Sequence, residues 1–282
     1  MNKNVEQDIT NPNKNIEQDI SNLKLSQPTI FIVVGMAGSG KTTFCQRLYS
    51  WISSDKCKID PKSGLNKHIF SVNLDPAVVN SKMPLNLDIK DHIDYYDVME
   101  KYNLGPNGAI TTSLNLFLLN ISQYMVFNSE YVIIDTPGQI ESFTWSSPGY
   151  VLKDFFSKIG NVIMIYVVDS EMSQDTSVFM SNMIYSISLM CRYNIPVLCT
   201  FNKTDISKSE KIETWIRDYE KFREDLDEEK STTPLLGSLA LNFEEFYNEI
   251  ETVSVSSKTG TGKDEFFKKV NEILGNNKFK YI

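Results

Sequence analysis

The segment "GMAGSGKTT" (Gly35 to Thr43) constrains the fold of this chain more than any other feature of its sequence. It follows the apolar run "IFIVV" and fits Gly-x4-Gly-Lys-Thr, a glycine-rich loop between a strand and a helix. Backbone N–H groups of such a loop, together with the dipole of the following helix, bind phosphate. In this pattern the lysine reaches the outer phosphates and the first threonine is a Mg²⁺ ligand. The predicted phosphate-binding residues are Gly35, Ala37, Gly38, Ser39, Gly40, Lys41, Thr42 and Thr43, with Thr42 at the metal.

Short apolar runs alternate with helix-length stretches along the rest of the chain. The runs "IFSVNL", "YVIIDT", "NVIMIYVVD" and "IPVLCTF" are apolar throughout, as in strands that are buried on both faces. This alternation predicts an α/β fold of three layers, a P-loop NTPase with a mostly parallel central sheet. Ligands of such sheets bind beyond the carboxyl ends of the strands, so the residues after each run are the functional candidates.

The first 27 residues differ in composition from the rest of the chain. They are polar and contain the near-duplication "NKNVEQDI" and "NKNIEQDI", which predicts a disordered tail, with a short coupled helix as the alternative. Residues 28–282 are predicted to form one nucleotide-binding domain. A charged helical insertion is predicted at about residues 207–250, either as a lid or partner face or as a simple solvated insert.

Composition argues against several classes of protein. The net charge of −8 does not suit a generic nucleic-acid binder, which would carry a basic stripe. No apolar run approaches the roughly 18 residues of a membrane helix, and the polar N-terminus does not resemble a secretory signal. Four scattered cysteines and two histidines argue against a zinc site and fit a reducing, cytoplasmic location.

Aspartates that follow two of the apolar runs are candidate site residues. Asp135 follows "YVII" and is the expected second Mg²⁺ ligand, acting through water. In the same segment Gly138 supplies an amide that can approach the γ-phosphate, and Gln139 resembles the residue that orients water in small GTPases. Asp75 follows "FSVNL" and has two interpretations: contact with the attacking water or metal shell, or the N-cap of a helix.

The segment "FNKTD" after another apolar run indicates which base is bound. The Asp205 carboxylate can accept from guanine N1–H and from its exocyclic amine, and adenine has no matching pair of donors. The Lys203 stem can lie along the base, and Asn202 can tie neighbouring loops together. The later "SSK" segment resembles a loop whose backbone N–H contacts guanine O6, a role assigned to Ser257.

These motifs together resemble the GPN-loop GTPases. The segments "GMAGSGKTTFCQRL", "VNLDPAV", "LGPNGAITTSLNLF", "IIDTPGQIESFTW", "FMSNMIYS" and "FNKTD" all look like that family. The similarity covers about residues 28–275 and is greatest to the eukaryotic type-one branch, which is implicated in RNA polymerase II assembly and nuclear import. Without this resemblance, "GPNG" would be read as a surface turn.

The resemblance implies a Mg²⁺-dependent, dimeric GTPase in which Gly105, Pro106 and Asn107 project into the partner's active site. A rigid neutral amide on Asn107 would stabilise charge there without reorganising. Water would attack in line, placed by Asp75, Asn107 and Gln139, with the P-loop lysine at the phosphates. The implied partners are a second copy or a paralogue, and RNA polymerase II subunits or assembly factors; the implied location is the cytoplasm with shuttling to the nucleus.

Two further functions fit part of the sequence. A nucleotide-binding adaptor with little hydrolysis would need only the binding motifs, but the intact Lys41, Thr42, Asp135 and Gln139 argue against it. A nickel-delivery GTPase has a similar dimeric core. The shortage of histidines and of paired cysteines argues against that alternative.

Overall fold

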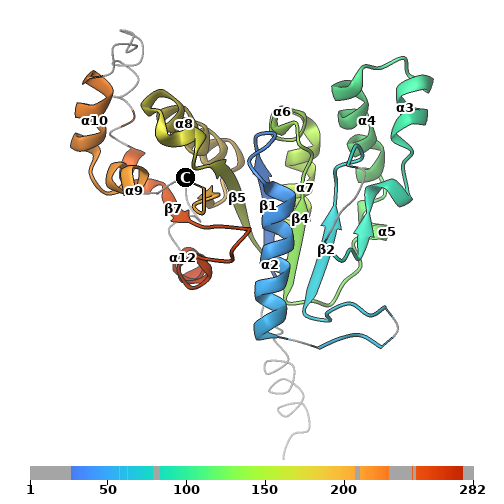
Figure 1. The fold of residues 1–282 in the computed structure, drawn as a ribbon. Coiled ribbons are helices and arrows are strands. Elements are labelled where there is room, and N and C mark those ends of the chain that lie inside the picture. Colours follow the sequence, from blue (N-terminus) through green and yellow to red (C-terminus); the bar gives the residue numbers. More distant parts are fainter. Residues whose placement is uncertain are drawn as a thin grey trace, which may run out of the picture.

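Seven strands form the central sheet of the computed structural model, in the order β3-β2-β4-β1-β5-β6-β7 (Figure 1). The structure describes residues 27–56, 58–61, 63–78, 83–206, 210–228, 243 and 246–275, and every strand pairing of the sheet among them is parallel. The α/β fold predicted from the sequence is therefore confirmed. The strands are β1 (Thr29–Gly35), β2 (Ile69–Asn73), β3 (Leu87–Asp88), β4 (Tyr131–Asp135), β5 (Asn161–Asp169), β6 (Val197–Asn202) and β7 (Glu251–Ser254).

Helices lie on both faces of this sheet (Figure 1). They are α2 (Lys41–Asp55), α3 (Tyr95–Lys101), α4 (Pro106–Leu118), α5 (Ile121–Tyr124), α6 (Ile140–Thr144), α7 (Ser147–Ser157), α8 (Thr176–Tyr193), α9 (Glu210–Arg217), α10 (Tyr219–Glu228) and α12 (Lys263–Gly275). Three 3-10 turns, η1 (Ile89–Asp91), η2 (Met172–Gln174) and η3 (Tyr247–Glu249), complete the described elements.

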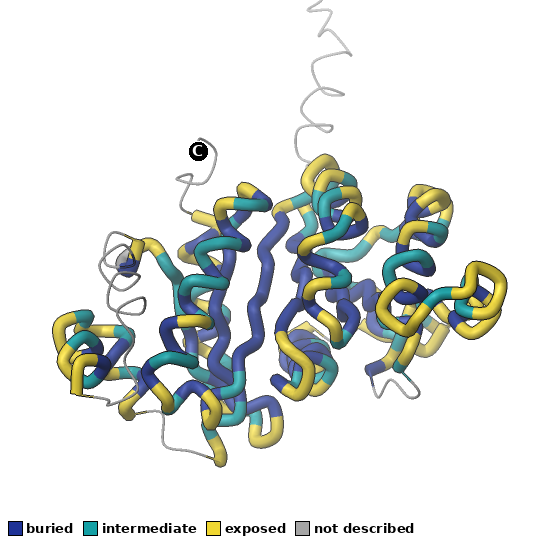
Figure 2. Tube along the Cα trace, turned by 90° about the horizontal axis from the view of Figure 1, so that it is seen from above, coloured by how far each residue is buried: buried dark blue, intermediate teal, exposed yellow. Residues whose placement is uncertain are grey.

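Alternate residues of β1 face two separate helical layers. Phe31 and Val33 belong to an apolar cluster that includes residues of α2 and α12. Ile30, Ile32 and Val34 belong to a second cluster, which includes residues of α4, α7 and α8. All five side chains are completely buried, and Figure 2 shows the strands as a buried layer between more exposed helices. The period of two along a strand thus produces the three layers.

The register of β1 brings the functional segments to one edge. Val33 pairs with Asp135 of β4, and Gly35 pairs with Val167 of β5. Successive strands are added on one side of β1 and then on the other, so the loop after β1 opens at the switch point of the sheet. Ligands of parallel α/β sheets bind at such a point.

The described part of the insertion predicted at about residues 207–250 is mainly helical. Trp215 of α9 and Phe222 of α10 are completely buried, and each ring centroid lies 5.2 Å from that of Phe179 on α8. The tail predicted for residues 1–27 lies outside the described residues, apart from Gln27. Among the helices that are described, none combines the length and the apolar character that crossing a membrane requires.

Candidate functional site

The predicted phosphate loop lies between β1 and α2. Gly40 has φ +91°, and a Cβ at this position would come within 2.7 Å of Asn202 Nδ2. A Cβ at Gly35 would lie 2.4 Å from the Val167 carbonyl oxygen, so both positions require glycine. A cavity of about 280 Å³ opens here. It is lined by Ala37, Gly38, Gly40, Lys41, Thr42, Thr43, Asp75, Thr136 and Gly138.

Lys41 and Asp135 are both buried beside this cavity, where burial shifts both of their pKa values. The Lys41 ammonium donates to the Met36 carbonyl at 2.9 Å, and burial lowers its pKa against the opposing charges of Asp135 and Asp75. Burial raises the pKa of the Asp135 carboxyl to about 6, although a hydrogen bond from Thr42 and the charge of Lys41 act in the opposite direction. A ligand of opposite charge beside either group would favour the charged form of that group.

A divalent cation fits the Thr42 and Asp135 pair. Asp135 is only 3% exposed, and its Oδ1 has no hydrogen-bond partner within the described part of the chain. An acceptor buried without a donor is unfavourable, and a hard cation prefers the oxygen ligands that carboxylate and hydroxyl groups supply. The residues predicted for Mg²⁺ therefore have the required chemistry.

Asp75 joins the segment after β2 to the segment after β4. Its Oδ2 accepts from the Gly138 backbone N–H at 3.1 Å, and its Oδ1 accepts from the Ala77 N–H at 3.0 Å. The N-cap interpretation differs from the structure, because Asp75 is followed by a turn rather than a helix over the described residues 76–78. Gln139 is exposed at the N-cap of α6 without a side-chain capping bond, which leaves its amide able to reach solvent.

Asn202 links the phosphate loop to the predicted base loop, as the sequence suggested. Its Nδ2 donates to the Ser39 carbonyl at 3.0 Å. Its Oδ1 accepts from both the N–H and the hydroxyl of Ser257, at 3.0 and 2.8 Å. The Asp205 Oδ1 accepts from the Ser256 hydroxyl at 2.6 Å, so the carboxylate predicted to read guanine is tied to the same loop.

The backbone amides of the loop after β7, among them the Ser257 N–H predicted to contact guanine O6, differ in their hydrogen bonding. The Ser257 N–H already donates to Asn202, because the Asn202 amide reaches it from the end of β6. The next amide along, that of Lys258, makes no hydrogen bond among the described residues. Adjacent amides of one loop cannot be distinguished by the sequence pattern alone.

Two residues of this region escaped the sequence analysis. Asp169 ends β5 and pairs with the Lys203 ammonium at 2.6 Å, while Lys203 itself adopts φ +68°. The final aspartate of "NVIMIYVVD" was the signal for it, since the other strand-end aspartates were selected on that basis. Arg47 on α2 bonds two carbonyls of the base loop, and no local pattern could have indicated a contact 210 residues away.

The residues Gly105, Pro106 and Asn107 do not form a separate turn. Gly105 is the N-cap of α4 with φ −73°, and Pro106 is the first residue of the helix. Proline suits that position, because its φ is already helical and its missing N–H would have no partner there. Asn107 is exposed in the first turn, and its side-chain amide makes no hydrogen bond that the described residues supply.

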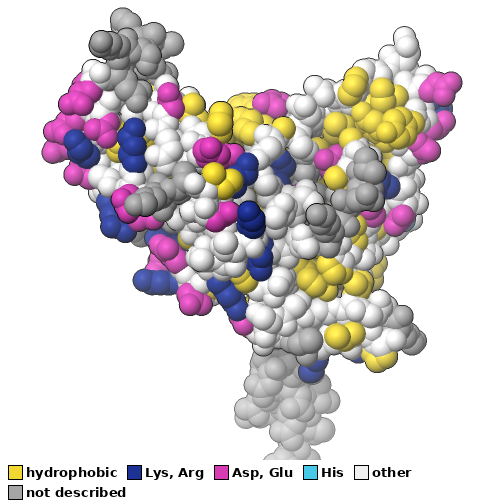
Figure 3. Space-filling view, viewed as in Figure 1, with side chains coloured by type: hydrophobic (Ala, Val, Ile, Leu, Met, Phe, Trp, Pro, Cys, Tyr) yellow, Lys and Arg dark blue, Asp and Glu magenta, His cyan; other side chains and the backbone are white. Residues whose placement is uncertain are grey.

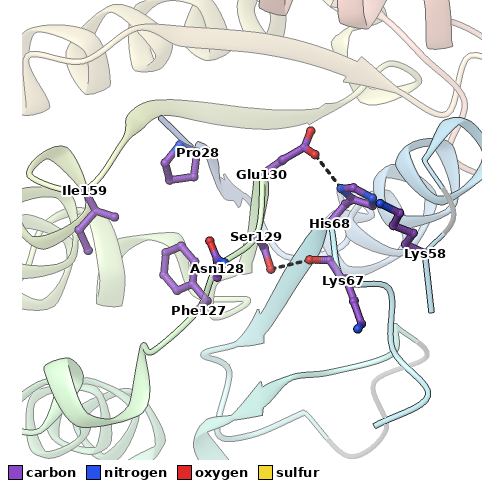
Figure 4. A pocket seen from close by; sticks show the side chains of 9 residues that line it. All are labelled: Pro28, Lys58, Lys67, His68, Phe127, Asn128, Ser129, Glu130 and Ile159. Atoms are coloured by element: carbon purple, nitrogen blue, oxygen red, sulfur yellow. Dashed lines mark hydrogen bonds and ion pairs between the residues drawn. The ribbon is translucent and has the colours of Figure 1, made fainter. Parts of the chain in front are cut away.

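A cavity larger than the one at the phosphate loop lies at the opposite, amino-terminal edge of the strands. It measures about 350 Å³ and is lined by Pro28, Lys58, Lys67, His68, Phe127, Asn128, Ser129, Glu130 and Ile159. Figure 4 shows that the Glu130 carboxylate contacts His68 Nδ1, at 2.7 Å, and that the Ser129 hydroxyl donates to the Lys67 carbonyl. None of the predicted site residues lines this cavity.

Comparisons with known proteins agree with these motifs. A family model described as "Conserved hypothetical ATP binding protein" matches residues 33–276. GPN-loop GTPase 1 of Dictyostelium discoideum is 41% identical over 253 residues, which cover 86% of this chain and 61% of that protein. GPN-loop GTPase 1 of Schizosaccharomyces pombe is 40% identical over 263 residues, which cover 88% and 69%. The chain thus spans less than two thirds of the first relative and slightly more of the second.

One solved structure gives a similar result for the fold. A GTPase of Pyrococcus abyssi, solved in its apo form, superimposes with a TM-score of 0.72. The match covers 88% of this chain and 98% of that chain at 22% sequence identity. Identity at this level supports the shared architecture of sheet and helices.

Proposed function

This chain belongs to the GPN-loop GTPase family, and from that premise we propose that it hydrolyses GTP to GDP and phosphate with Mg²⁺, as a dimer. The resemblance predicted from the motifs is thereby confirmed. One observation carries the proposal for the reaction. The phosphate loop, a buried carboxylate and the Asn-Lys-x-Asp segment meet at one edge of the sheet, where Asn202 bonds Ser39 directly.

The base assignment is guanine rather than adenine. The description of the family model names ATP, but the segment "FNKTD" supports GTP. Asp205 is exposed at the carboxyl end of the sheet, and the Ser256 hydroxyl orients one of its oxygens. The other oxygen and the neighbouring Lys258 N–H can meet the donors and the acceptor of a guanine edge.

The residues of the chain would bind the phosphates and place the attacking water, and none of them would form a covalent bond with the nucleotide. Lys41, released from the Met36 carbonyl, would bind the outer phosphates, as would the Gly138 amide. Asp75 and Gln139 would then place the attacking water, since in-line attack depends mainly on positioning and on stabilised charge. Thr42 and Asp135 would hold Mg²⁺, which when bound neutralises charge between the phosphates.

A second subunit is proposed to complete the site. The exposed side-chain amide of Asn107 has no hydrogen-bond partner among the residues that the structure describes, which leaves it able to contact another molecule. Figure 3 shows hydrophobic side chains gathered over α3 and α4, and Tyr96 and Tyr102 there are 76% and 48% exposed. An apolar patch beside the residues named for the family's loop supports a subunit interface on this face.

The role in the cell is proposed from the motifs that resemble the type-one branch of the family. A nucleotide-dependent switch would bias a client's assembly by exposing different faces in its GTP and GDP states. We propose RNA polymerase II subunits or assembly factors as clients, and a cytoplasmic protein that shuttles to the nucleus. The partner subunit is proposed to be either a second copy or a paralogous GPN-loop GTPase.

The reaction is tested by single-turnover phosphate release from GTP and from ATP, combined with native mass measurement. We expect hydrolysis of GTP, little hydrolysis of ATP and loss of activity in EDTA. Release of phosphate from both nucleotides at equal rates would contradict the guanine assignment. A dimer that holds GTP but releases no phosphate, even with a paralogue added, would favour a nucleotide-binding adaptor instead.

A further inference from the structure

Arg47 connects the helix that begins at the phosphates to the loop that is proposed to read the base. It lies on α2, six positions after Lys41. Its Nε donates to the Ser257 carbonyl and its Nη2 donates to the Lys258 carbonyl, both at 2.7 Å. A planar guanidinium can bind two successive carbonyls in this way, whereas an ammonium group lacks the fixed fork of donors.

These two bonds fix the orientation of the peptide groups that they contact. In a planar trans peptide, the carbonyl and the N–H of the next residue point in opposite directions. The bond to the Ser257 carbonyl therefore directs the Lys258 N–H away from Arg47. The bond to the Lys258 carbonyl likewise directs the Thr259 N–H, which donates to the Ser256 hydroxyl at 3.1 Å.

We propose that Arg47 is a positioning residue for base specificity, which turns the Lys258 N–H toward the six-position of the base. This inference rests on the proposed guanine-nucleotide function. Guanine carries an acceptor, O6, at that position, and adenine carries an amine donor. With the peptide held as observed, the loop offers a donor and suits guanine. If the peptide turned over, the Ser257 carbonyl would face the base and would suit adenine.

The surroundings of Arg47 make this orientation specific. The Ser257 N–H is bound by Asn202, which leaves the Lys258 N–H as the free donor of the pair within the described residues. Gly260 has φ +87°, and a Cβ there would approach Arg47 Nη1 to 3.3 Å, so the loop closes tightly over the guanidinium. The Ser256 hydroxyl donates to Asp205 and accepts from the Thr259 N–H, so the Asp205 carboxylate is held by Ser256 and not by Arg47.

The test measures the affinities of this chain for GDP, 6-thio-GDP and ADP in the presence of Mg²⁺. In 6-thio-GDP a sulfur, which is a weak acceptor, replaces O6 and leaves the rest of the base unchanged. Arg47→Met keeps the length of the side chain and removes its donors; Arg47→Lys keeps the charge. Arg217→Met is the matched control, because Arg217 is 78% exposed on α9 and lies outside the base loop.

We expect the wild type to prefer GDP over 6-thio-GDP and ADP. Arg47→Met should lower the affinity for GDP about ten-fold, because one hydrogen bond to the base is lost. The affinity for 6-thio-GDP should change about two-fold or less. Arg47→Lys should fall between, and Arg217→Met should match the wild type. The inference is overturned if the Arg47 variants lower the affinities for all three nucleotides equally, or if they change none of them. A wild type that binds GDP no better than ADP would instead refute the proposed function itself.

Discussion

The Asp75 carboxylate accepts a hydrogen bond from the Gly138 backbone amide at 3.1 Å. Both residues line the predicted phosphate cavity, so the segments that follow β2 and β4 meet there. A γ-phosphate would compete with Asp75 for this amide, because both are anionic acceptors. GTP binding would thus release Asp75 to interact with water, and the loss of the γ-phosphate would let the bond form again.

Asp75→Ala should therefore separate binding from turnover. Without the competing carboxylate, we expect affinity for a non-hydrolysable GTP analogue to rise a few-fold relative to GDP. Single-turnover hydrolysis should fall about 10²-fold, as when a water-positioning group is lost. Asp91→Ala, an exposed aspartate on η1, serves as the control. Parallel losses of analogue affinity and turnover would show that Asp75 only maintains the fold of the segment.

Asn107→Ala tests whether the start of α4 acts on another subunit. The side chain is exposed and makes no hydrogen bond to the described residues of its own subunit, so thermal stability and GDP affinity should be unchanged. Turnover should fall about 10²-fold, the usual effect of removing one charge-stabilising donor. Asn120→Ala is the matched control, an exposed asparagine near the other end of α4. Unchanged turnover in the dimer would remove Asn107 from the mechanism.

The sequence was sufficient for elements whose cause is local. The loop after β1 needs glycines wherever a Cβ would collide with Asn202 or Val167, and those glycines formed the recognisable pattern. Strands that are buried on both faces required continuous apolar runs, so β1, β4 and β5 could be read directly from the chain.

The rest depended on distant partners. The turn interpretation of "GPNG" relied on residue types that also suit a helix start, and only the packing of α4 on the sheet distinguishes the two. The roles of Arg47 and Asp169 depend on contacts with residues 257 and 203, far away in sequence. Likewise, the hydrogen bond that the Ser257 N–H donates to Asn202, at the end of another strand, is not visible in the local sequence.

Asp169 is expected to hold Lys203 in the position where its stem would lie along the base. It holds the Lys203 ammonium at 2.6 Å, and both side chains are partly exposed, so the pair adds little to stability. Asp169→Asn should leave the melting temperature within about 2 °C, since a loss below about 0.5 kcal/mol is expected. GDP affinity should fall about three- to ten-fold, because the lysine stem is no longer held beside the base. Calorimetric titration with GDP measures the affinity. A variant with a much lower melting temperature would indicate that Asp169 has a structural role instead.

The ionised form of the buried Asp135 carboxyl is expected to destabilise the fold when no metal is bound and to be needed for metal binding. Burial raises its pKa in the folded chain to about 6, from an ordinary value of about 3.9 for an aspartate. The folded state therefore binds this proton more tightly than the unfolded state does, and ionisation destabilises the fold as pH rises from about 4 to 6. Asparagine cannot ionise, so Asp135→Asn removes this loss of stability. The gain in the free energy of unfolding should be complete above about pH 6.

The prediction is measured by denaturant unfolding in EDTA, without nucleotide, at about pH 4.5 and 7.5 and at low protein concentration. The stability of Asp135→Asn relative to the wild type should increase by about 2 kcal/mol between the two pH values. With GTP and Mg²⁺ the order should reverse, because the variant loses an anionic ligand and its turnover should fall at least about 10²-fold. A difference in stability that does not change with pH would mean that the pKa of the Asp135 carboxyl is the same in the folded and the unfolded chain, which would contradict the prediction.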